Sequence, residues 1–181
     1  MKQYKILELC HKVAPGAQPV FIAINPDPRC DPGDCFANVR RKVLQEGGRI
    51  QYGWALWEWP GVFIEAEHHS VYEPSAGSAW HDLTPCPRGS SRLFLPDDSA
   101  TYDFESEGVR RDNVRLALSD GPLIDAFFKA GKNRTAFYNQ LPGVGMLSIR
   151  KFEDKERHTI ERRLARAVAA LAEKYGRNER I

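Results

Sequence analysis

Two neighbouring strand-like segments constrain how this chain can fold. Residues 50–57 and 61–73 are rich in β-branched and aromatic side chains, which favour strands. A Trp-Pro-Gly sequence at residues 59–61 separates them and is typical of a turn between adjacent strands. Shorter apolar segments predict further strands at residues 19–24, 80–84 and 93–95. We therefore expect an antiparallel sheet over residues 49–95.

A helix pattern precedes this sheet, between residues 35 and 46. Its apolar stripe, at the spacing of one helix face, consists of Phe36, Val39, Val43 and Leu44. Gly47-Gly48 ends the helix. Asp34, or Asp31 if the helix begins earlier, is a candidate N-cap. The proline-rich residues 25–33 predict a loop before it.

Helix patterns also lie toward both ends of the chain. Residues 3–13 suit a short helix, with a strand as the alternative. Residues 122–130 predict a helix with proline in its first turn and Gly131 at its end. The polar residues 99–113 predict surface structure or a flap, and residues 145–149 are a candidate strand.

The clearest helix pattern spans residues 153–175 and ends at Gly176. Its apolar face consists of Ile160, Leu164, Val168, Leu171 and Tyr175. Its other face carries Arg157, Arg162, Arg163 and Arg166. A solvated face is the simpler interpretation of these arginines, and an acidic partner or nucleic acid is the alternative. The formal net charge of +2 is too small to indicate a nucleic-acid partner.

Length and composition indicate one soluble domain. The chain has 181 residues, of which 42% are hydrophobic and 28% are charged, as in ordinary globular proteins. Its apolar runs are shorter than the ~18 residues of a membrane span, and its first residues do not resemble a signal peptide. We therefore expect a cytoplasmic protein with reduced cysteines. We expect a single domain over residues 1–181, with its core at about 19–95 and a helical part at about 110–176.

Three residue types follow one another in an order that suits acyl-transfer chemistry. Cys35 stands at the expected helix start, His68 and His69 lie in a strand, and Asp82 lies in the next strand. A helix N-terminus favours a thiolate nucleophile. A neighbouring histidine can hold the proton and deliver it to the leaving group, and a carboxylate orients that histidine.

The pattern alone leaves open which histidine acts. Side chains alternate along a strand, so His68 and His69 point to opposite faces. His68 shares its face with Ile64 and Ala66, whereas His69 shares its face with Glu65. This periodicity favours His68 on a core side, but a core side is not always the side that carries a site.

A longer pattern surrounds these residues. It comprises Gly33-Asp34-Cys35, Gly47-Gly48, the histidine strand, and Trp80, Asp82, Thr84 and Pro85. Over residues 33–85 it resembles the transglutaminase-like branch of the papain-like superfamily. The resemblance implies an α+β fold in which the helix bearing Cys35 packs on an antiparallel sheet, with helices added C-terminally. It also implies a triad of Cys35, His69 and Asp82 that acts on a protein or peptide amide through a thioester, without a cofactor.

One part of the resembled pattern is missing. Papain-like enzymes often place a glutamine several residues before the cysteine to stabilise the oxyanion, and Arg29 lies there in this chain. Gln18, Asn25 or the Cys35 backbone amide could replace it. Trp80 is a further candidate site residue, because some of the four tryptophans are expected to line a pocket.

Two other functions compete with this interpretation. Cys30 and Cys35 have a spacing seen among zinc ligands, and His68 could join them, with His69, His81 or Cys86 as other ligands. The second alternative is a catalytically inactive transglutaminase-like scaffold or binding module.

Overall fold

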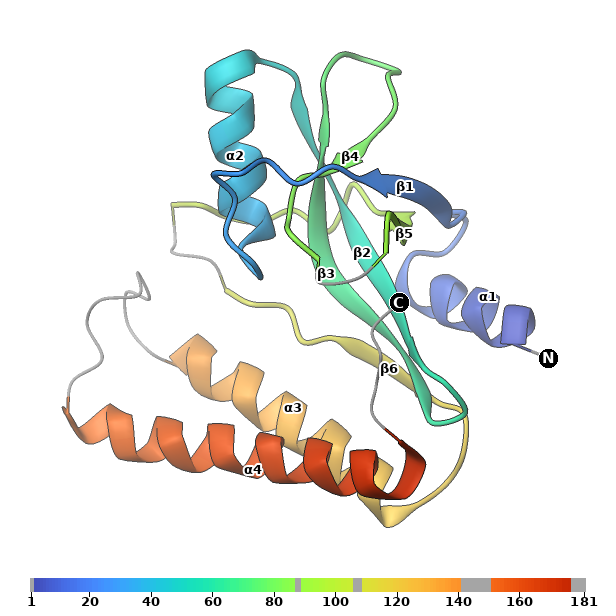
Figure 1. Cartoon of the computed structure of the whole chain (residues 1–181), viewed down its shortest axis with the longest axis vertical. Coiled ribbons are helices and arrows are strands. Elements are labelled where there is room, and N and C mark those ends of the chain that lie inside the picture. Colours follow the sequence, from blue (N-terminus) through green and yellow to red (C-terminus); the bar gives the residue numbers. More distant parts are fainter. Residues whose placement is uncertain (1, 87–88, 106–108, 141–150, 177–181) are drawn as a thin grey trace.

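The protein has an α+β fold in which helices surround a small sheet (Figure 1). The computed structural model describes residues 2–86, 89–105, 109–140 and 151–176. The helices are α1 (Lys2–Val13), α2 (Cys35–Glu46), α3 (Pro122–Gln140) and α4 (Lys151–Tyr175). The strands are β1 (Val20–Ile24), β2 (Arg49–Trp59), β3 (Phe63–Glu73), β4 (His81–Asp82), β5 (Ser91–Pro96) and β6 (Val114–Ala117). Over the residues described, none of these helices is long and apolar enough to cross a membrane.

The sheet closes into a five-stranded barrel. Its strand order is β2-β5-β1-β4-β3, and β3 pairs with β2 again, while β6 pairs with β3 as an added strand. β1 and β4 are parallel, and the other pairs are antiparallel. The antiparallel pairing expected over residues 49–95 is confirmed, and the parallel pair arises from β1, which precedes that range. Strand patterns do not specify partners, and the long connection from β1 to β4 through α2 and the β2–β3 hairpin permits parallel pairing.

The strand register gathers polar side chains inside the barrel. Because side chains alternate along a strand, the pairings place His69, Asp82, Arg92 and Phe94 on one face of the sheet. All four are at most 6% exposed. A buried face shared by all strands of a closed barrel is its inner face. The barrel therefore encloses ionisable groups beside apolar ones.

Two apolar clusters pack around the outside of this polar interior. In the first, Leu9 and Cys10 of α1 pack with Trp54, Leu56, Ile64, Ala66 and Leu95, on the opposite face of β2, β3 and β5. In the second, α3 and α4 cover the turn end of the β2–β3 hairpin (Figure 1). Its buried members are Trp59, Val62, Phe63, Ile124, Phe127 and Leu171. The helix predicted at residues 3–13 is confirmed, and it adds to the core expected at residues 19–95.

Several local predictions differ from the structure. The predicted helix end at Gly131 is wrong, because α3 continues through this glycine. A Cβ atom at Gly131 would lie 3.0 Å from Arg115 Nη2, so the glycine makes room for a guanidinium. The strand expected at residues 80–84 shortens to β4, and β6 was not expected. The candidate strand at residues 145–149 lies outside the described residues.

Candidate active site

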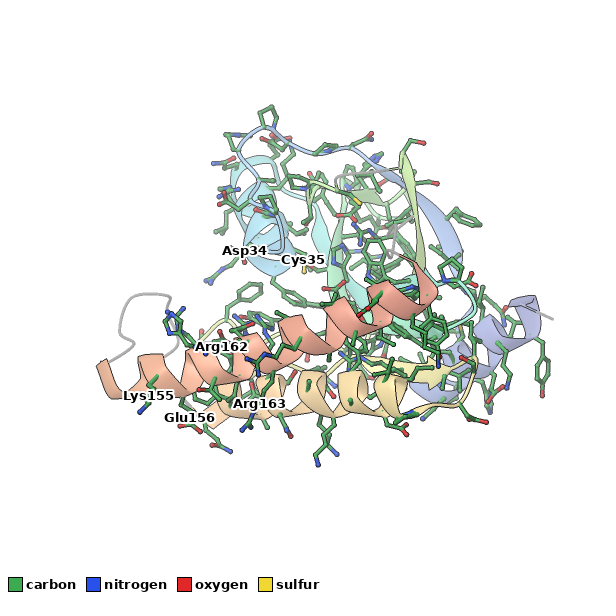
Figure 2. All side chains as sticks on the ribbon, turned by 60° about the horizontal axis from the view of Figure 1, so that its bottom comes forward. Asp34, Cys35, Lys155, Glu156, Arg162 and Arg163 are labelled. Atoms are coloured by element: carbon green, nitrogen blue, oxygen red, sulfur yellow. The ribbon has the colours of Figure 1, made fainter. Side chains whose placement is uncertain are left out.

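Cys35 is the first residue of α2 and lies beside Asp34 (Figure 2). Asp34 occupies the N-cap position predicted for it, but its exposed side chain makes no capping hydrogen bond. No Asp34 carboxylate therefore competes for the first-turn amides of Cys35, Phe36 and Ala37, which have no acceptor within the helix. A helix N-terminus of this kind favours negative charge on a sulfur or an acyl oxygen.

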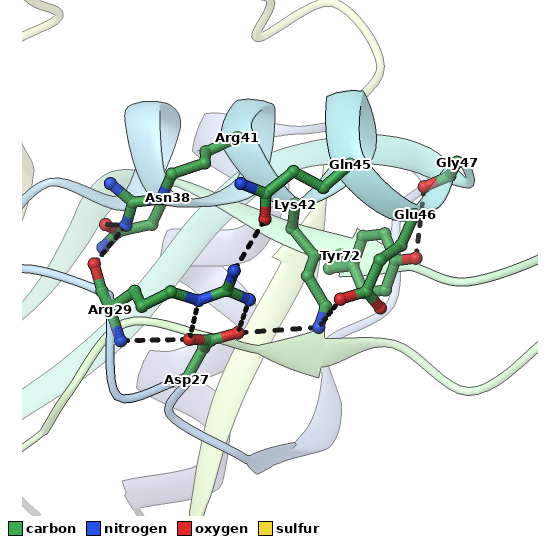
Figure 3. Close-up of polar contacts among 9 residues, drawn as sticks. All are labelled: Asp27, Arg29, Asn38, Arg41, Lys42, Gln45, Glu46, Gly47 and Tyr72. Atoms are coloured by element: carbon green, nitrogen blue, oxygen red, sulfur yellow. Dashed lines mark hydrogen bonds and ion pairs between the residues drawn. The ribbon is translucent and has the colours of Figure 1, made fainter.

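The loop between β1 and α2 is fastened to α2 by charged side chains (Figure 3). Asp27 accepts hydrogen bonds from the Arg29 backbone N–H at 3.0 Å and from its Nη2 at 2.8 Å. Lys42 Nζ lies 3.6 Å from Asp27 Oδ2. Arg29 Nη1 donates to Gln45 Oε1 at 3.0 Å, and the Arg29 carbonyl accepts from Arg41. Arg29 is thus engaged in holding the loop, and its guanidinium is not available to an oxyanion.

Asn38 connects this loop to the segment that follows β4. Its side chain is 1% exposed and exchanges hydrogen bonds with the Asp31 backbone, at 2.8 Å to the carbonyl and 3.1 Å from the N–H. Asn38 Nδ2 also lies 3.5 Å from Thr84 Oγ1. Thr84 in turn donates its N–H to Asp82 Oδ1 at 2.9 Å. Sequence reasoning missed Asn38, and its place one helix turn after Cys35 was the available signal.

His69 joins Cys35 to Asp82. Its Nε2 lies 3.0 Å from Asp82 Oδ2, and its ring is hydrogen-bonded to the Cys35 side chain. With Nε2 engaged by the carboxylate, Nδ1 is the ring nitrogen left for the sulfur. Cys35 is 6%, His69 5% and Asp82 0% exposed. The structure therefore brings together, from α2, β3 and β4, the three residues that the sequence selects.

Arg92 is a fourth member of this cluster that sequence reasoning did not identify. Its Nε forms an ion pair with Asp82 Oδ2, without the alignment of a hydrogen bond. Its guanidinium lies 4.5 Å from the centre of the Trp57 ring, and the residue is 6% exposed. The only sequence signal for Arg92 was its position as a single charged residue directly before the apolar segment at residues 93–95. Arg92 and His69 contact the same carboxylate oxygen, Asp82 Oδ2, and the Arg92 guanidinium compensates the buried Asp82 charge.

The charges around His69 determine its protonation. Burial alone would lower the pKa of His69, but the negative charges of Cys35 and Asp82 and the hydrogen bonds to both raise it to about 10. Burial would also raise the pKa of Asp82, but His69, Arg92 and the Thr84 N–H together hold that pKa below its usual value. At neutral pH the site therefore holds an imidazolium between a carboxylate and a sulfur.

We expect the His69 ring to keep its proton until the pH reaches about 10. Because the pKa of His69 is raised, the ring stays protonated at pH values well above 6.5, where an ordinary histidine loses its proton. NMR titration of the histidine rings measures this directly, with the exposed His11 as an internal comparison. Cys35→Ser should lower the His69 midpoint, because it removes one of the two negative neighbours. A His69 midpoint near 6.5 in the unaltered protein would contradict the proposed charge arrangement.

His68 makes a different set of contacts. Its Nε2 lies 2.6 Å from the Ala100 carbonyl oxygen, and its ring packs against Phe36 at 4.7 Å and Trp54 at 5.4 Å. Burial, the largest influence, lowers the pKa of His68, so the neutral ring donates its Nε2–H to the carbonyl. Of the two histidines left open by the sequence, the structure places His69 against Cys35 and uses His68 to hold the segment after β5.

The side chains expected to replace the missing glutamine are placed elsewhere. Asn25 Nδ2 lies 3.1 Å from His81 Nδ1, and the Asn25 N–H donates to the Asp82 carbonyl at 2.8 Å. Gln18 is exposed and precedes β1, whose other end pairs with β4. At about 3.3 Å per strand residue, Gln18 lies on the order of 20 Å from that end. Of the predicted oxyanion donors, the Cys35 backbone amide is the one that remains beside the sulfur.

Trp80 supports the site indirectly, through Phe94. Its ring meets Phe94 edge-on, with the ring centres 6.0 Å apart. Phe94 is fully buried, and its ring centre lies 6.5 Å from that of His69. Trp80 therefore helps to fix the apolar wall behind the imidazole.

The metal site considered from the sequence is not assembled. Among the residues that the structure describes, no group of three or more histidine, cysteine, aspartate or glutamate side chains is placed to hold a metal ion. Cys30 packs into an apolar cluster with Val39, whereas Cys35 is bound to His69 and His68 to Ala100. The four cysteines are thiols.

The basic face expected on the C-terminal helix carries both signs of charge. Lys155, Arg162 and Arg163 are exposed on α4, but so is Glu156 beside them (Figure 2). Arg157 is partly buried and does not belong to the exposed face. An acidic partner for α4 stays a prediction.

No family model, curated protein or solved structure matches this chain. The relationship to transglutaminase-like proteins therefore stays a prediction from short motifs. Function has to be inferred from the contacts, burial and charges of the site itself.

Proposed function

We propose that this protein is a thiol-dependent amide hydrolase or acyltransferase, with Cys35 as nucleophile, His69 as acid and base, and Asp82 as the residue that orients His69. The supporting observation is the buried His69 ring held between the Cys35 sulfur and the Asp82 carboxylate. A relationship to the transglutaminase-like branch of the papain-like superfamily belongs to the same proposal. It is supported by the Cys, His, Asp order and by a cysteine at a helix N-terminus.

In the first half of the reaction the Cys35 thiolate attacks the amide carbonyl carbon. A C–S bond forms, and the electron pair of the C=O double bond moves to the oxygen. The α2 amides face the charge that develops there. When the C=O bond re-forms, the C–N bond breaks and the His69 imidazolium gives its proton to the departing amine. The products are an amine and an acyl thioester on Cys35.

In the second half, water or an amine attacks the thioester carbonyl. The neutral His69 ring takes a proton from the attacking group, the C–S bond breaks, and the Cys35 thiolate and the imidazolium are restored. Water gives hydrolysis, and an amine gives acyl transfer. Because the Cys35 residue is only 6% exposed, we propose an amide on an extended protein or peptide segment, which can reach a recessed side chain, as the substrate.

The order in which the cysteines react with iodoacetamide tests whether Cys35 is activated. Exposure alone predicts that Cys30 and Cys86, which are partly exposed, react before the buried Cys10 and Cys35. The neighbouring imidazolium predicts that Cys35 reacts first at pH 7, because the thiolate is the reactive form. Mass spectrometry of digested protein after short exposures identifies the modified residue. Cys10 is the matched buried control, since burial raises the pKa of its thiol.

Preferential labelling of Cys35, despite its burial, supports an activated nucleophile. Labelling that follows exposure, with Cys35 as slow as Cys10, would contradict it and favour an inactive scaffold that keeps the fold. The His69→Ala protein should lose the preference, because the group that favours the thiolate is removed.

A further inference from the structure

A short segment after β5 is fixed firmly next to α2. The Asp97 N–H donates to the Tyr52 carbonyl at 3.0 Å, and Trp54 Nε1 donates to Asp97 Oδ2 at 2.9 Å. Ala100 is fully buried and accepts the hydrogen bond from His68 at 2.6 Å. These contacts tie residues 97–100 to the outer face of the barrel. The position of the residues that follow is therefore set by the fold.

Tyr102 is held by this segment over the start of α2. Its backbone N–H is hydrogen-bonded to the Tyr52 hydroxyl. Its ring stacks on Phe36, the residue after Cys35, with the ring centres 4.2 Å apart and the planes 7° apart. The Phe104 ring meets the Tyr102 ring edge-on, with the ring centres 4.9 Å apart. The aromatic contacts leave Tyr102 half-buried, with little freedom to move away from the nucleophile.

The Tyr102 hydroxyl lies in the field of the catalytic group. Burial is the largest influence raising the pKa of Tyr102; Arg110 opposes it, and the negative charges of Asp34 and Cys35 reinforce it. The phenol therefore keeps its proton at neutral pH and is a hydrogen-bond donor. Among the residues that the structure describes, none is hydrogen-bonded to this hydroxyl.

We propose that Tyr102 is a further catalytic residue, whose hydroxyl donates a hydrogen bond to the acyl oxygen when Cys35 attacks the carbonyl. This inference rests on the proposed acyl-transfer function. Gln18, Asn25 and Arg29, the side chains nearest in sequence to a papain-like donor, are exposed at the far end of β1 or engaged elsewhere. Tyr102 and the α2 amides would together stabilise the oxyanion.

Two reagents separate oxyanion stabilisation from activation of the sulfur. With p-nitrophenyl acetate, the Cys35 sulfur adds to the carbonyl, the carbonyl oxygen becomes negative, and p-nitrophenolate leaves as the acetyl thioester forms. With iodoacetamide, the sulfur displaces iodide from a CH₂ carbon, and no oxyanion appears. A residue that donates to the oxyanion therefore affects the first reaction and not the second.

Tyr102→Phe is the informative variant, because it keeps the ring stacked on Phe36 and removes only the hydroxyl. We expect the rate of Cys35 acetylation to fall about 100-fold, as for the loss of one oxyanion donor in other enzymes. The rate of Cys35 alkylation by iodoacetamide should stay unchanged. Tyr4→Phe is the matched control, because Tyr4 is 71% exposed on α1, and it should change neither rate.

The remaining outcomes overturn the inference. Wild-type acetylation in Tyr102→Phe would show that the hydroxyl does not contact the acyl oxygen. An equal loss in both reactions would show that Tyr102 acts on the sulfur or on its position. Failure of the unaltered protein to acetylate Cys35 would overturn the proposed function itself, and this inference with it. A loss in Tyr102→Phe that is confined to acetylation therefore tests the role of the Tyr102 hydroxyl separately from the proposed acyl-transfer function.

Discussion

Replacing Cys35 with serine is expected to abolish acylation by p-nitrophenyl acetate while leaving the fold intact. A serine hydroxyl is a weak nucleophile unless a base takes its proton in the attack, and Asp82, which also raises the pKa of His69, still favours the protonated ring in this variant. The substitution changes one atom of a side chain that is 6% exposed, so packing is preserved. We expect the rate of acetylation to fall on the order of 10³-fold or more.

Release of p-nitrophenolate and the mass of the acetylated protein measure this loss together. Cys30→Ser is the matched control, because Cys30 is a thiol on the loop that leads to α2 and packs against the cluster of Val39, Tyr72 and Leu83. It should acetylate at the wild-type rate. Undiminished acetylation of the Cys35→Ser protein would end the proposal that Cys35 is the nucleophile. His69→Ala should also lose acetylation, because both the acid and the base are removed.

Replacing Asp82 with alanine is expected to remove activity and also to destabilise the fold by about 3–5 kcal/mol, as for the loss of one partner from a buried ion pair. Asp82 is fully buried, and it is in contact with the positive charges of both Arg92 and His69. Without the carboxylate these buried groups lose the negative charge that compensates them. Thr84 also loses the acceptor for its N–H.

Urea unfolding followed by tryptophan fluorescence gives the free energy of unfolding. Removing both charges in Asp82→Ala/Arg92→Met should recover much of the stability, because no arginine charge is then left buried. The double variant should stay inactive, since His69 still lacks the residue that orients it. A loss below about 1 kcal/mol in Asp82→Ala would show that the ion pair does not hold the barrel together.

The elements predicted best from the sequence were those whose pattern lies in residues close together along the chain. The helix at Cys35 and the hairpin of β2 and β3 follow from periodicity and turn residues, and the structure places both near their expected bounds. The choice of His69 drew on its place nearer the turn and on the spacing to Asp82, whereas alternation alone favoured His68 on a core side. The register explains why that choice matches the geometry, because His69 and Asp82 share the inner face of the barrel.

Beyond the triad that the resemblance implied, the sequence did not predict the contacts that depend on which strands become neighbours. Arg92 reaches Asp82 only because β5 and β4 both pair with β1. Tyr102 reaches Phe36 only because the segment after β5 is tied to β2 and β3. Asp34 stands at the predicted N-cap position, but its side chain does not make the capping hydrogen bond that the residue type favours. Pairing and loop position are set by the whole fold, and local propensity does not encode them.

The two-residue length of β4 links chemistry to the integrity of the barrel. β4 pairs with β3 through a single residue pair, Tyr72 with His81, so few backbone bonds close the seam on that side. A seam this short can open by local unfolding at a lower free energy than the rest of the protein. Opening would carry Asp82 away from His69. Under the proposed function, closure of this seam is a condition for the contact between His69 and Asp82 on which the chemistry depends.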